Sequence, residues 1–395
     1  MKLIDVCELI VDCPHSTAKD EGQGIPLVRT PNIGKGRLEL SGVHRVSETV
    51  YNQRIERAIP KAGDLILARE APVGNVALIM PGQKVCLGQR VVLIRPDKGK
   101  ADAAYLTYYL LSEEVQHRLI NNANGAVVAH LNMNEIRNLQ IDLPNISVQK
   151  RIAGILSSLD DKIALNKRIN HNLEEQAQAL YKSWFVDFKP FKGGKFVDSE
   201  LGMIPEGWRV GTIYDICDVY FGAPFNSTLF NTEKKGFPLI RIRDLAKQEA
   251  GVFTEECHPK GQLACKGDIL VGMDGEFSIY IWGGEDSWIN QRISRFSPKQ
   301  GISHYFLTET LRPRLKAVEY SEVATTVIHI GKNDYDKFLV LIPPQNVLDS
   351  FYRVSEPLYL QYVENLSGNQ YLSKSRDILL PRLMSGDFAF SDIIS

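Results

Sequence analysis

The sequence predicts an α+β protein with two similar globular domains in a pseudo-twofold arrangement, separated by two long antiparallel helices that form a coiled coil. Three observations predict this fold class. The chain of 395 residues repeats itself after about half its length, strand-like runs precede helical ones without strict alternation, and each copy ends in one long helical segment. A chain of this length is also too long to fold around a single hydrophobic core, which favours two or three domains.

The repeat is a duplication of half the chain. His130 in the first copy matches His329 in the second, at an offset of 199 residues (329 − 130). Solenoid repeats are only about 20–50 residues long, so this period marks two related halves. Two related halves predict two similar working surfaces for a partner with two related sites. The other matched positions include Asn134 with Asn333, Gly24 and Arg29 with Gly236 and Arg241, Gly63-Asp64 with Gly267-Asp268, and Gln89-Arg90 with Gln291-Arg292.

Each half begins with short runs rich in β-branched residues, separated by turn residues as strands are, and continues into an amphipathic helix. In the first half the predicted strands cover 25–30, 64–70, 75–80 and 90–95, and the helix covers 101–121. In the second half they cover 237–243, 268–273, 277–282 and 292–296, and the helix covers 303–319. Strands and helices do not alternate strictly, so α+β fits better than a doubly wound sheet.

A long helix follows each globular portion. The segment 147–185 contains no glycine or proline except Gly154, and its apolar residues recur at close to 3,4 spacing. Asn166 interrupts that seam, and Asn365 interrupts the second seam at the matching place, which favours two helices that pair in one register. The alternative, that each helix only covers its own domain, fits two matching seams less well. The predicted seam residues are Ile152, Ile155, Leu159, Asn166, Leu173, Leu180, Phe351, Val354, Leu358, Asn365, Leu372 and Leu379.

These elements divide the chain into six segments. The two globular domains are expected at 1–145 and 211–345, and the long helices at 146–187 and 346–385. The segment 188–210, rich in glycine, proline and charge, is predicted to be a linker, and 386–395 to be a tail.

Composition favours a soluble cytoplasmic protein. The chain has no apolar run near the ~20 residues of a membrane helix, its first residues lack the apolar core of a signal peptide, and its six cysteines form no metal or disulfide framework. A net charge of −1 argues against a tight nucleic-acid binder that acts alone. The halves differ, since residues 1–195 carry 26 basic and 21 acidic side chains (net +5), whereas the remainder carries 20 and 26 (net −6).

The sequence lacks the motifs of an enzyme. It has no Walker phosphate loop, no GxSxG or HExxH motif, and no Asn/Asp-Pro-Pro-aromatic loop of the kind that amino-methyltransferases use. His130 and His329 lie among apolar residues of expected strands, so we interpret them as structural. We therefore expect a non-catalytic chain that itself binds no cofactor and no metal. The rejected enzymatic alternative is a self-contained nuclease or methyltransferase.

The long first helix resembles a known family. Residues 147–163, 166–170 and 173–188 are similar to the central conserved region of type I restriction-modification specificity (S) subunits. Residues 204–208 (Ile-Pro-Glu-Gly-Trp) are similar to the start of that family's second target-recognition domain. The resemblance covers essentially the whole chain, and its helix motif is highly specific, whereas its domain motifs are loose. Residues 143–145 (Leu-Pro-Asn) depart from the Pro-Pro usual at this turn.

The resemblance implies a sequence-specific DNA-recognition subunit of a restriction system. Each target-recognition domain would read one half of an interrupted double-stranded DNA target, and helices roughly 58 Å long would set the gap. Two methyltransferase (M) subunits would dock on the helices, and restriction and translocation (R) subunits would join them for phage defence. S-adenosylmethionine, ATP and Mg²⁺ would be bound by those partners. Because the halves differ in charge, we expect an asymmetric target. Because the whole chain is nearly neutral, we expect tight DNA binding only when partner subunits add phosphate contacts.

The candidate DNA contacts are polar residues in loops and at strand ends of each half. In the major groove, Arg and Lys read guanine, and Asn and Gln read adenine. Each candidate can also be an ordinary surface or turn residue, and the matched Gln-Arg pair can be structural, because repetition preserves packing too. The first-domain candidates are Ser16, Thr17, Arg29, Thr30, Asn32, Lys35, Arg69, Gln89 and Arg90, and the second-domain candidates are Asn226, Ser227, Arg241, Arg243, Asp274, Gln291 and Arg292.

One binding alternative remains open. The same duplicated architecture would suit a stand-alone DNA-binding regulator or an antirestriction protein without a methyltransferase partner. The two functions differ in whether the purified chain binds specific DNA by itself.

Overall fold

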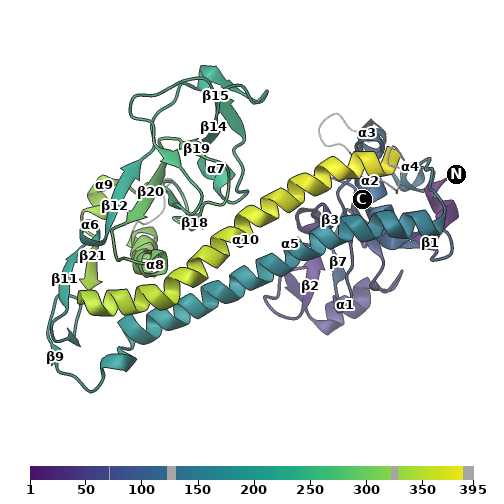
Figure 1. The fold of residues 1–395 in the computed structure, drawn as a ribbon. Helices are drawn as coiled ribbons and strands as arrows, with labels where there is room; N and C mark the ends of the chain where they lie inside the picture. The colour runs from purple at the N-terminus through teal and green to yellow at the C-terminus, as the bar shows by residue number, and fades with distance from the viewer. Residues whose placement is uncertain (71, 122–129, 322–327, 386–395) are drawn as a thin grey trace. The chain divides into compact units, whose positions relative to one another are not determined.

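The computed structural model describes residues 1–70, 72–121, 130–321 and 328–385 of the chain. The chain divides into two compact units (Figure 1). Unit 1 consists of Met1–Asp161 and Ser373–Ser395, and unit 2 consists of Lys162–Leu372. Each unit therefore combines one globular domain with parts of both long helices. The predicted tail at 386–395 lies outside the described residues.

A five-stranded sheet forms the centre of unit 1. Leu65 and Val92 belong to the core on one face of this sheet, and Ile66 and Val91 belong to the core on the other, because successive side chains of a strand point to opposite sides. Burial on both faces explains why these strands read as continuous apolar runs in the sequence. The strand order is β1 (Cys7–Asp12), β8 (Val91–Pro96), β5 (Leu65–Ala68), β6 (Val76–Leu78) and β3 (Gly36–Arg37). A three-stranded sheet contains β4 (Arg45–Val46), β2 (Ile25–Val28) and β7 (Cys86–Leu87).

The helix predicted at 101–121 is two helices. Ser112 has an extended backbone, and its hydroxyl donates to the carbonyl oxygen of Tyr109 at 2.7 Å. A serine that bonds its local backbone in this way competes with helix continuation, and the chain restarts as a new helix one residue later. The helices of unit 1 before the long ones are η1 (Leu3–Val6), η2 (Thr30–Asn32), α1 (Glu48–Arg54), α2 (Ala103–Leu111), α3 (Glu113–Asn121) and α4 (Met133–Arg137).

Unit 2 repeats the central sheet of unit 1. Strands β12 (Cys217–Phe221), β20 (Ile293–Pro298), β17 (Ile269–Gly272) and β18 (Ile279–Ile281) follow the same order as β1, β8, β5 and β6. A second sheet contains β13 (Phe230–Asn231), β15 (Val252–Thr254), β14 (Phe237–Ile240), β19 (Ser287–Ile289) and β16 (Leu263–Ala264), and β11 (Arg209–Thr212) pairs with β21 (Leu339–Ile342). The short helices are α6 (Ile213–Ile216), η5 (Ser227–Leu229), α7 (Ile242–Leu245) and α9 (Lys332–Tyr335), and α8 spans His304–Ser321.

The strand predicted at 237–243 ends earlier than expected. Strand β14 stops at Ile240, and the next residues form α7. The carboxylate of Asp244 accepts from the backbone N–H of Arg241 at 3.0 Å, a bond that starts a helical turn. The strand was predicted too long because the apolar alternation continues into this turn, whereas the hydrogen bond from Arg241 to Asp244 ends the strand.

Two of the repeated motifs are structural turns. Asp64 accepts from the backbone N–H of Lys61 at 2.9 Å, and Asp268 accepts from that of Cys265 at 2.7 Å. The repeated glycines before β2 and β14 are required by space and by backbone conformation. Gly24 and Gly236 have positive φ angles of 101° and 78°, and a Cβ atom would lie within 2.3 Å and 2.2 Å of a carbonyl oxygen.

The segment predicted as a linker, 188–210, is part of the second domain. It contains η4 (Lys189–Phe191), β9 (Phe196–Val197), β10 (Ile204–Pro205) and the start of β11. Trp208 is buried in the core of unit 2, and its ring centroid lies 4.9 Å from that of Phe191. The aromatic residues spaced through a segment rich in glycine and proline explain why it packs rather than remaining solvated.

The two long helices, α5 (Ile146–Tyr181, continued by the π-helical turn η3, Lys182–Val186) and α10 (Gln345–Ser385), pair antiparallel. Within unit 2, Asn166 donates to Asn369 at 2.9 Å, and Asn365 donates to Asn170 at 2.8 Å. From Asn166 to Asn170 along one helix, the partner changes from Asn369 back to Asn365 on the other, as antiparallel pairing requires. We call these four residues the asparagine quartet.

The contact between the helices is more polar than the predicted seam. Val354, assigned to the seam, is 51% exposed, and this assignment is wrong. Ile152 and Phe351 are buried, but they pack in the cores of the first and second domain respectively. The ends of the seam therefore cover the domains, and its centre pairs the helices. Asn166, Leu173 and Asn365 are buried, whereas Ile155, Leu159, Leu180, Leu358, Leu372 and Leu379 are half-buried.

A buried ion pair joins the two helices within unit 1. Asp160 is 4% exposed, accepts from the Tyr108 hydroxyl at 2.6 Å, and pairs with the guanidinium of Arg376 at 2.7 Å. Burial lowers the pKa of Arg376, but the carboxylates of Asp160 and Asp377 together outweigh that effect and raise it. Burial, and then the same carboxylate, raise the pKa of Tyr108. Arg376 therefore supplies the counter-charge of Asp160, and Tyr108 supplies a hydrogen bond.

Replacement of Arg376 by methionine should destabilise unit 1 by about 3–5 kcal/mol, because a buried carboxylate loses its counter-charge. Urea unfolding of the purified chain would measure this change. Arg382→Met, at an exposed position of the same helix, should change stability by less than about 0.5 kcal/mol. Adding Asp160→Asn to Arg376→Met should recover part of the loss, and equal unfolding midpoints for Arg376→Met and the wild type would contradict the assignment.

Candidate nucleic-acid interface

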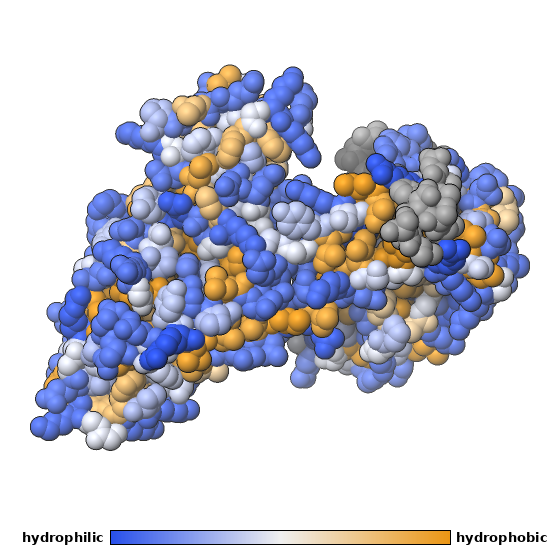
Figure 2. Space-filling view, in the orientation of Figure 1, coloured by the Kyte–Doolittle hydropathy of each residue, from blue (hydrophilic) through white to orange (hydrophobic). Residues whose placement is uncertain are grey.

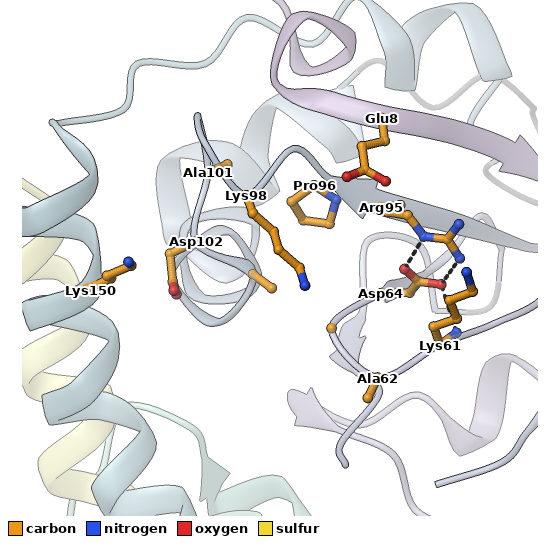
Figure 3. Close-up of a pocket in the computed structure, with 12 residues that line it drawn as sticks. Glu8, Lys61, Ala62, Asp64, Arg95, Pro96, Lys98, Ala101, Asp102 and Lys150 are labelled. Carbon is orange, nitrogen blue, oxygen red and sulfur yellow. Dashed lines mark hydrogen bonds and ion pairs between the residues drawn. The ribbon is translucent and has the colours of Figure 1, made fainter. Parts of the chain in front are cut away.

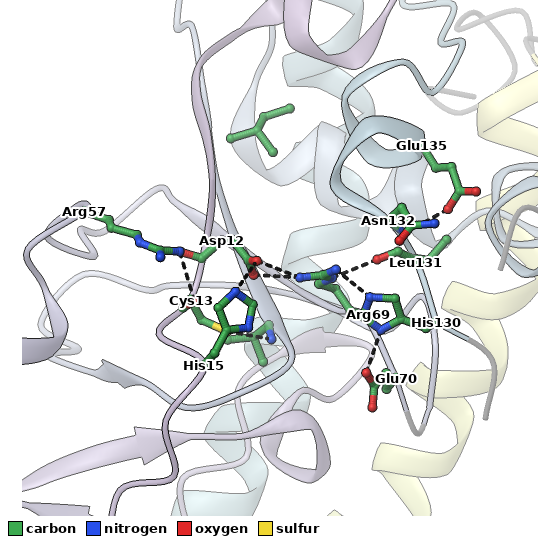
Figure 4. Close-up of polar contacts among 12 residues, drawn as sticks. Asp12, Cys13, His15, Arg57, Arg69, Glu70, His130, Leu131, Asn132 and Glu135 are labelled. Carbon is green, nitrogen blue, oxygen red and sulfur yellow. Dashed lines mark hydrogen bonds and ion pairs between the residues drawn. The ribbon is translucent and has the colours of Figure 1, made fainter. Parts of the chain in front are cut away.

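Arg69, one of the predicted contact residues, lies in a polar cluster of the first domain (Figure 4). Arg69 lies at its centre and is 7% exposed. Its Nε donates to the carbonyl oxygen of Leu131 at 2.8 Å, Nη1 donates to both carboxylate oxygens of Asp12 at 2.8 Å, and Nη2 lies 2.6 Å from Nε2 of His130. Each guanidinium nitrogen is thus occupied by the protein. The prediction that Arg69 contacts DNA is corrected, because its environment is that of a structural arginine.

Glu70 links this buried centre to the surface. Its Oε1 lies 2.6 Å from Nδ1 of His130, and its Oε2 lies 3.0 Å from Nε of Arg90. Arg69 donates to Nε2 of His130, so the imidazole is neutral with its proton on Nδ1, a tautomer inferred from the partners. Arg90 has a 59% exposed side chain and a positive φ of 64°. A non-glycine residue rarely adopts this backbone conformation, which costs energy and is concentrated at functional sites.

The loop after β1 borders the same cluster. The Gln89 amide donates to the carbonyl oxygen of His15. Arg54, which is buried, donates to the carbonyl oxygen of Ser16 at 2.9 Å and to its hydroxyl at 3.2 Å. Ser16 and Thr17 are exposed. The loop is therefore held by a buried arginine while its polar side chains face solvent.

The candidates at 29–35 are mostly turn residues. The Asn32 side chain accepts from the backbone N–H of Arg29 at 3.0 Å and so starts η2. Thr30 is buried, Arg29 and Asn32 are half-buried, and Lys35 is exposed. The prediction of Thr30 as a DNA contact is corrected for this reason. Of this group, Lys35 has the side chain most accessible to DNA.

The second domain contains a counterpart of the Glu70 cluster. The carboxylate of Asp274 lies 2.7 Å from Nδ1 of His329 and 3.6 Å from Nε of Arg292. Nη1 of Arg292 lies 3.1 Å from the same Nδ1. The shorter contact favours a proton on Nδ1 that is donated to Asp274. A carboxylate between a histidine and an arginine thus recurs in both halves.

The backbone around the two clusters is also matched. The N–H of Arg69 donates to the carbonyl of Arg90 at 2.9 Å, and the N–H of Met273 donates to that of Arg292 at 2.9 Å. The N–H of Leu131 donates to the carbonyl oxygen of Arg69 at 3.2 Å, and the N–H of Ile330 donates to that of Met273 at 3.0 Å. The duplication has therefore kept one backbone frame for the histidine, the carboxylate and the arginine.

The remaining second-domain candidates fall into two groups. Arg241 is half-buried, with its Nε 3.0 Å from the Asp244 carboxylate, and Asn226 accepts from the N–H of Thr228 at 3.1 Å. Both therefore support turns, although the Asn226 side chain remains exposed. Exposed side chains without such a turn role belong to Ser227, Arg243, Gln291 and Arg292.

The sequence did not indicate that the two histidines contact charged side chains. Both were interpreted as structural residues in apolar strands, but His130 and His329 are partly exposed and contact charged groups. The repeat of the histidine at a fixed offset was the available signal. The apolar neighbours in the sequence gave no indication of these charged partners.

Unit 1 also contains a cleft of about 420 Å³ (Figure 3). Its lining mixes basic residues such as Lys61, Lys98 and Lys150 with Glu8 and Asp102. Within the described ranges, no group of three His, Cys, Asp or Glu side chains is placed to hold a metal ion. The mixed charge of the cleft favours neither an anion nor a cation.

Cys7, which is half-buried, and Cys217, which is buried, have little nucleophilic character. Burial raises the pKa values of the Cys7 and Cys217 thiols to about 12. Both thiols are therefore protonated near neutral pH, and a thiolate is the reactive form. Across the described parts of the chain, none of the helices combines the length and apolarity that crossing a membrane requires.

Comparison with known proteins places this geometry in a family. The sequence matches the type I restriction modification DNA specificity domain over residues 1–175 and again over 205–347. It is 30% identical to the type I restriction enzyme MjaIX specificity subunit of Methanocaldococcus jannaschii, over 89% of this chain and 83% of the relative. It is 21% identical to the HindI specificity subunit of Haemophilus influenzae, over 83% of this chain and 87% of that protein.

A solved structure shares the fold. The S subunit of a type I restriction-modification system from M. genitalium aligns with 97% of this chain and 95% of its own, with a TM-score of 0.55 and 15% sequence identity. At that identity the likeness shows the fold alone, whereas the two matched domains and the long alignment with a 30% identical relative show the family. The chain belongs to the specificity subunits of type I restriction-modification systems.

Proposed function

We propose that this chain reads a bipartite double-stranded DNA target, one half with each domain, within a complex that also contains methyltransferase and restriction subunits. The observation that carries the proposal is the duplicated cluster of histidine, carboxylate and arginine on a matched backbone frame in each domain. Arginine is the side chain that most often reads guanine in the major groove. Two related reading surfaces fit a target with two half-sites.

The asparagine quartet supports a pseudo-twofold relation between the helices. By the repeat offset of 199 residues, Asn166 corresponds to Asn365 and Asn170 to Asn369 (365 − 166 and 369 − 170). The hydrogen bonds join Asn166 to Asn369 and Asn170 to Asn365. Asn166 thus pairs with the counterpart of Asn170, and Asn170 pairs with the counterpart of Asn166, as an isologous contact requires. In the proposed function, the paired helices act as a spacer between two equivalent readers.

The lengths of the helices suit that role. Helix α5 has 36 residues and α10 has 41, which corresponds to about 54 Å and 62 Å at 1.5 Å per residue. Half-sites read from one face of B-DNA lie about 34–36 Å apart per helical turn. Helices of this length can span such a gap without contacting the bases within it.

The two half-sites should differ in sequence. Arg69, the buried centre of the first cluster, has Met273 as its counterpart by the offset that relates Gly63 to Gly267 (204 residues). In the first domain Arg69 therefore occupies Nε2 of His130, whereas within the described part of the second domain Nε2 of His329 forms no hydrogen bond. Different surroundings for the same frame favour different bases in each half-site.

Apolar side chains exposed along the long helices support docking of further subunits. Val354, Leu360 and Tyr371 of α10 in unit 2 are all more than half exposed, as is Ile378 of α10 in unit 1. Apolar groups reach the surface over the helices (Figure 2). Exposed apolar residues in number mark interaction surfaces. We assign this surface to the methyltransferase subunits, with S-adenosylmethionine bound by them and with ATP and Mg²⁺ used by the restriction subunits.

Co-expression with a cognate methyltransferase subunit should produce methylated adenines in one interrupted motif with two unequal halves. Long-read sequencing of the host DNA would map them. A continuous motif, or methylation that does not depend on this chain, would contradict the proposed function. Specific binding by the purified chain alone, without the methyltransferase subunit, would favour a stand-alone regulator.

Insertion of four residues after Asp161, with four more after Ser373, should lengthen the gap and leave the bases unchanged. The insertions lie outside the asparagine quartet and add one helical turn, about 6 Å, to both helices. At 3.4 Å per base pair this corresponds to about two additional base pairs. The same four residues inserted after Gly194, in an exposed turn, should not alter the gap. Altered bases with an unaltered gap would contradict the role of the helices as a spacer.

Arg243→Ala should weaken specific DNA binding by the complex by about 1–3 kcal/mol, because its exposed guanidinium is available to DNA. Arg241→Ala should instead lower the stability of the second domain, because Arg241 pairs with the buried Asp244. Filter binding and urea unfolding of both variants would separate the two effects. Equal losses of binding in both variants, with unchanged stability, would contradict this distinction.

A further inference from the structure

We propose that Glu70 and Asp274 are positioning residues that hold Arg90 and Arg292 for end-on recognition of a guanine, one in each half-site. This inference deepens the proposed function and depends on it. Glu70, His130 and Arg90 form the first reading cluster, and Asp274, His329 and Arg292 form the second. In each cluster the carboxylate lies between the imidazole Nδ1 and the arginine Nε.

The carboxylate contacts the arginine at Nε and leaves the two terminal nitrogens for DNA. In the first cluster Nε of Arg90 lies 3.0 Å from Glu70, and within the described part of unit 1 neither terminal nitrogen of Arg90 forms a hydrogen bond. Guanine presents two acceptors, N7 and O6, to the major groove, and the two terminal nitrogens of a guanidinium can bind both at once. The free end of Arg90 therefore matches the guanine edge in number and in geometry.

The brace that holds the arginine is itself fixed. The Glu70 side chain is only 15% exposed, and the Nδ1 of His130, 2.6 Å away, constrains its second oxygen. Arginine is a flexible side chain that loses rotamer freedom when it binds, and holding it beforehand reduces that loss. The strained backbone of Arg90, with φ at 64°, fixes the start of the same side chain. The side chain is thus held at both its root and its Nε.

The charge balance favours a base over a phosphate as the target of these arginines. Glu70 and Asp274 each neutralise the arginine that they hold, so its long-range attraction for a phosphate is weakened. Recognition of a base edge depends instead on the direction of the N–H groups, and the carboxylate fixes that direction. Exposed Lys35, on a separate loop, is better suited to a phosphate.

The second cluster differs from the first at the Nε2 atom of its histidine, which is available to bind DNA. Arg69 occupies Nε2 of His130 in the first cluster, but Met273 replaces Arg69 in the second. Within the described residues of unit 2, Nε2 of His329 forms no hydrogen bond. Nη1 of Arg292 lies 3.1 Å from Nδ1 of His329, but that nitrogen carries the proton donated to Asp274 and cannot accept from Arg292, so Nη1 keeps its N–H groups for DNA. The second cluster therefore presents an imidazole nitrogen beside its arginine, and the two half-sites need not share their bases around the guanine.

The test compares four substitutions in the complex of the full chain with its methyltransferase subunit: Glu70→Gln, Arg90→Lys, Asp274→Asn and Arg292→Lys. Competition binding with duplexes that carry single base-pair changes would give the preference at each position. Loss of one bidentate contact should reduce the preference for guanine at one position by roughly 5- to 150-fold. Lysine keeps the charge but loses the fork, so Arg90→Lys should relax the same position as Glu70→Gln.

The two halves provide internal controls for each other. Glu70→Gln should leave the half-site of the second domain unchanged, and Asp274→Asn should leave that of the first domain unchanged. Glu48→Gln, which removes an exposed ion pair with Lys84, should relax neither. Unaltered preference in both carboxylate variants would overturn the inference. A loss of base preference across a whole half-site, as loss of a domain would produce, would also overturn the inference. A wild-type half-site without a G·C pair would overturn it too.

The outcomes separate this inference from the function on which it depends. If the wild-type complex shows no bipartite preference, the proposed function fails. If the wild type shows it and the carboxylate variants match the wild type, only the assignment of Glu70 and Asp274 as positioning residues fails.

Discussion

Amide pairing between the two long helices is the constraint on which the rest of the structure depends. An apolar seam tolerates sliding by one turn, because one leucine replaces another at little cost. A buried amide that loses its partner costs about 1–3 kcal/mol, so the asparagine quartet accepts few registers. The Asp160–Arg376 pair adds a charged contact with the same effect. Polar groups therefore determine which helix residues meet, and each globular domain packs on helix segments whose register is already decided.

Duplication has kept the frame and changed what it carries. The N–H groups of Arg69 and Met273 make equivalent backbone bonds, although one side chain is a charged donor and the other an apolar thioether. Backbone bonds of this kind depend on the strand pairing and not on the side chain, so a frame can persist while its surface diverges. The retained residues are a histidine, a carboxylate and an arginine. A frame that repeats while its surroundings vary suits a protein whose two halves bind related but unequal sites.

The sequence alone predicted the duplication, the two long helices and most of the buried strands, because each leaves a periodic pattern. It also identified Arg90 and Arg292 as a matched pair, but it assigned the same role to Arg69. Burial distinguishes Arg69 from the two exposed arginines. Arg69 is buried in a pairing with Asp12, which lies 57 residues away in the chain. The exposed Val354 shows the same limit, since its spacing fits a seam whose direction is set by polar contacts. Local features such as the break at Ser112 depend on a single hydrogen bond that no period reveals.

The last turns of α10 belong to the core of unit 1. Leu383 is buried in the same cluster as Leu3 and Tyr105, near the other end of the chain. A ribosome that has synthesised the first 145 residues has therefore not yet supplied all the residues that this core contains. Synthesis from the N-terminus gives each domain an opportunity to fold as it emerges. Here the first domain is completed only after the second has been made, and a nascent chain that stops before the last helix leaves that core open to solvent and to chaperones.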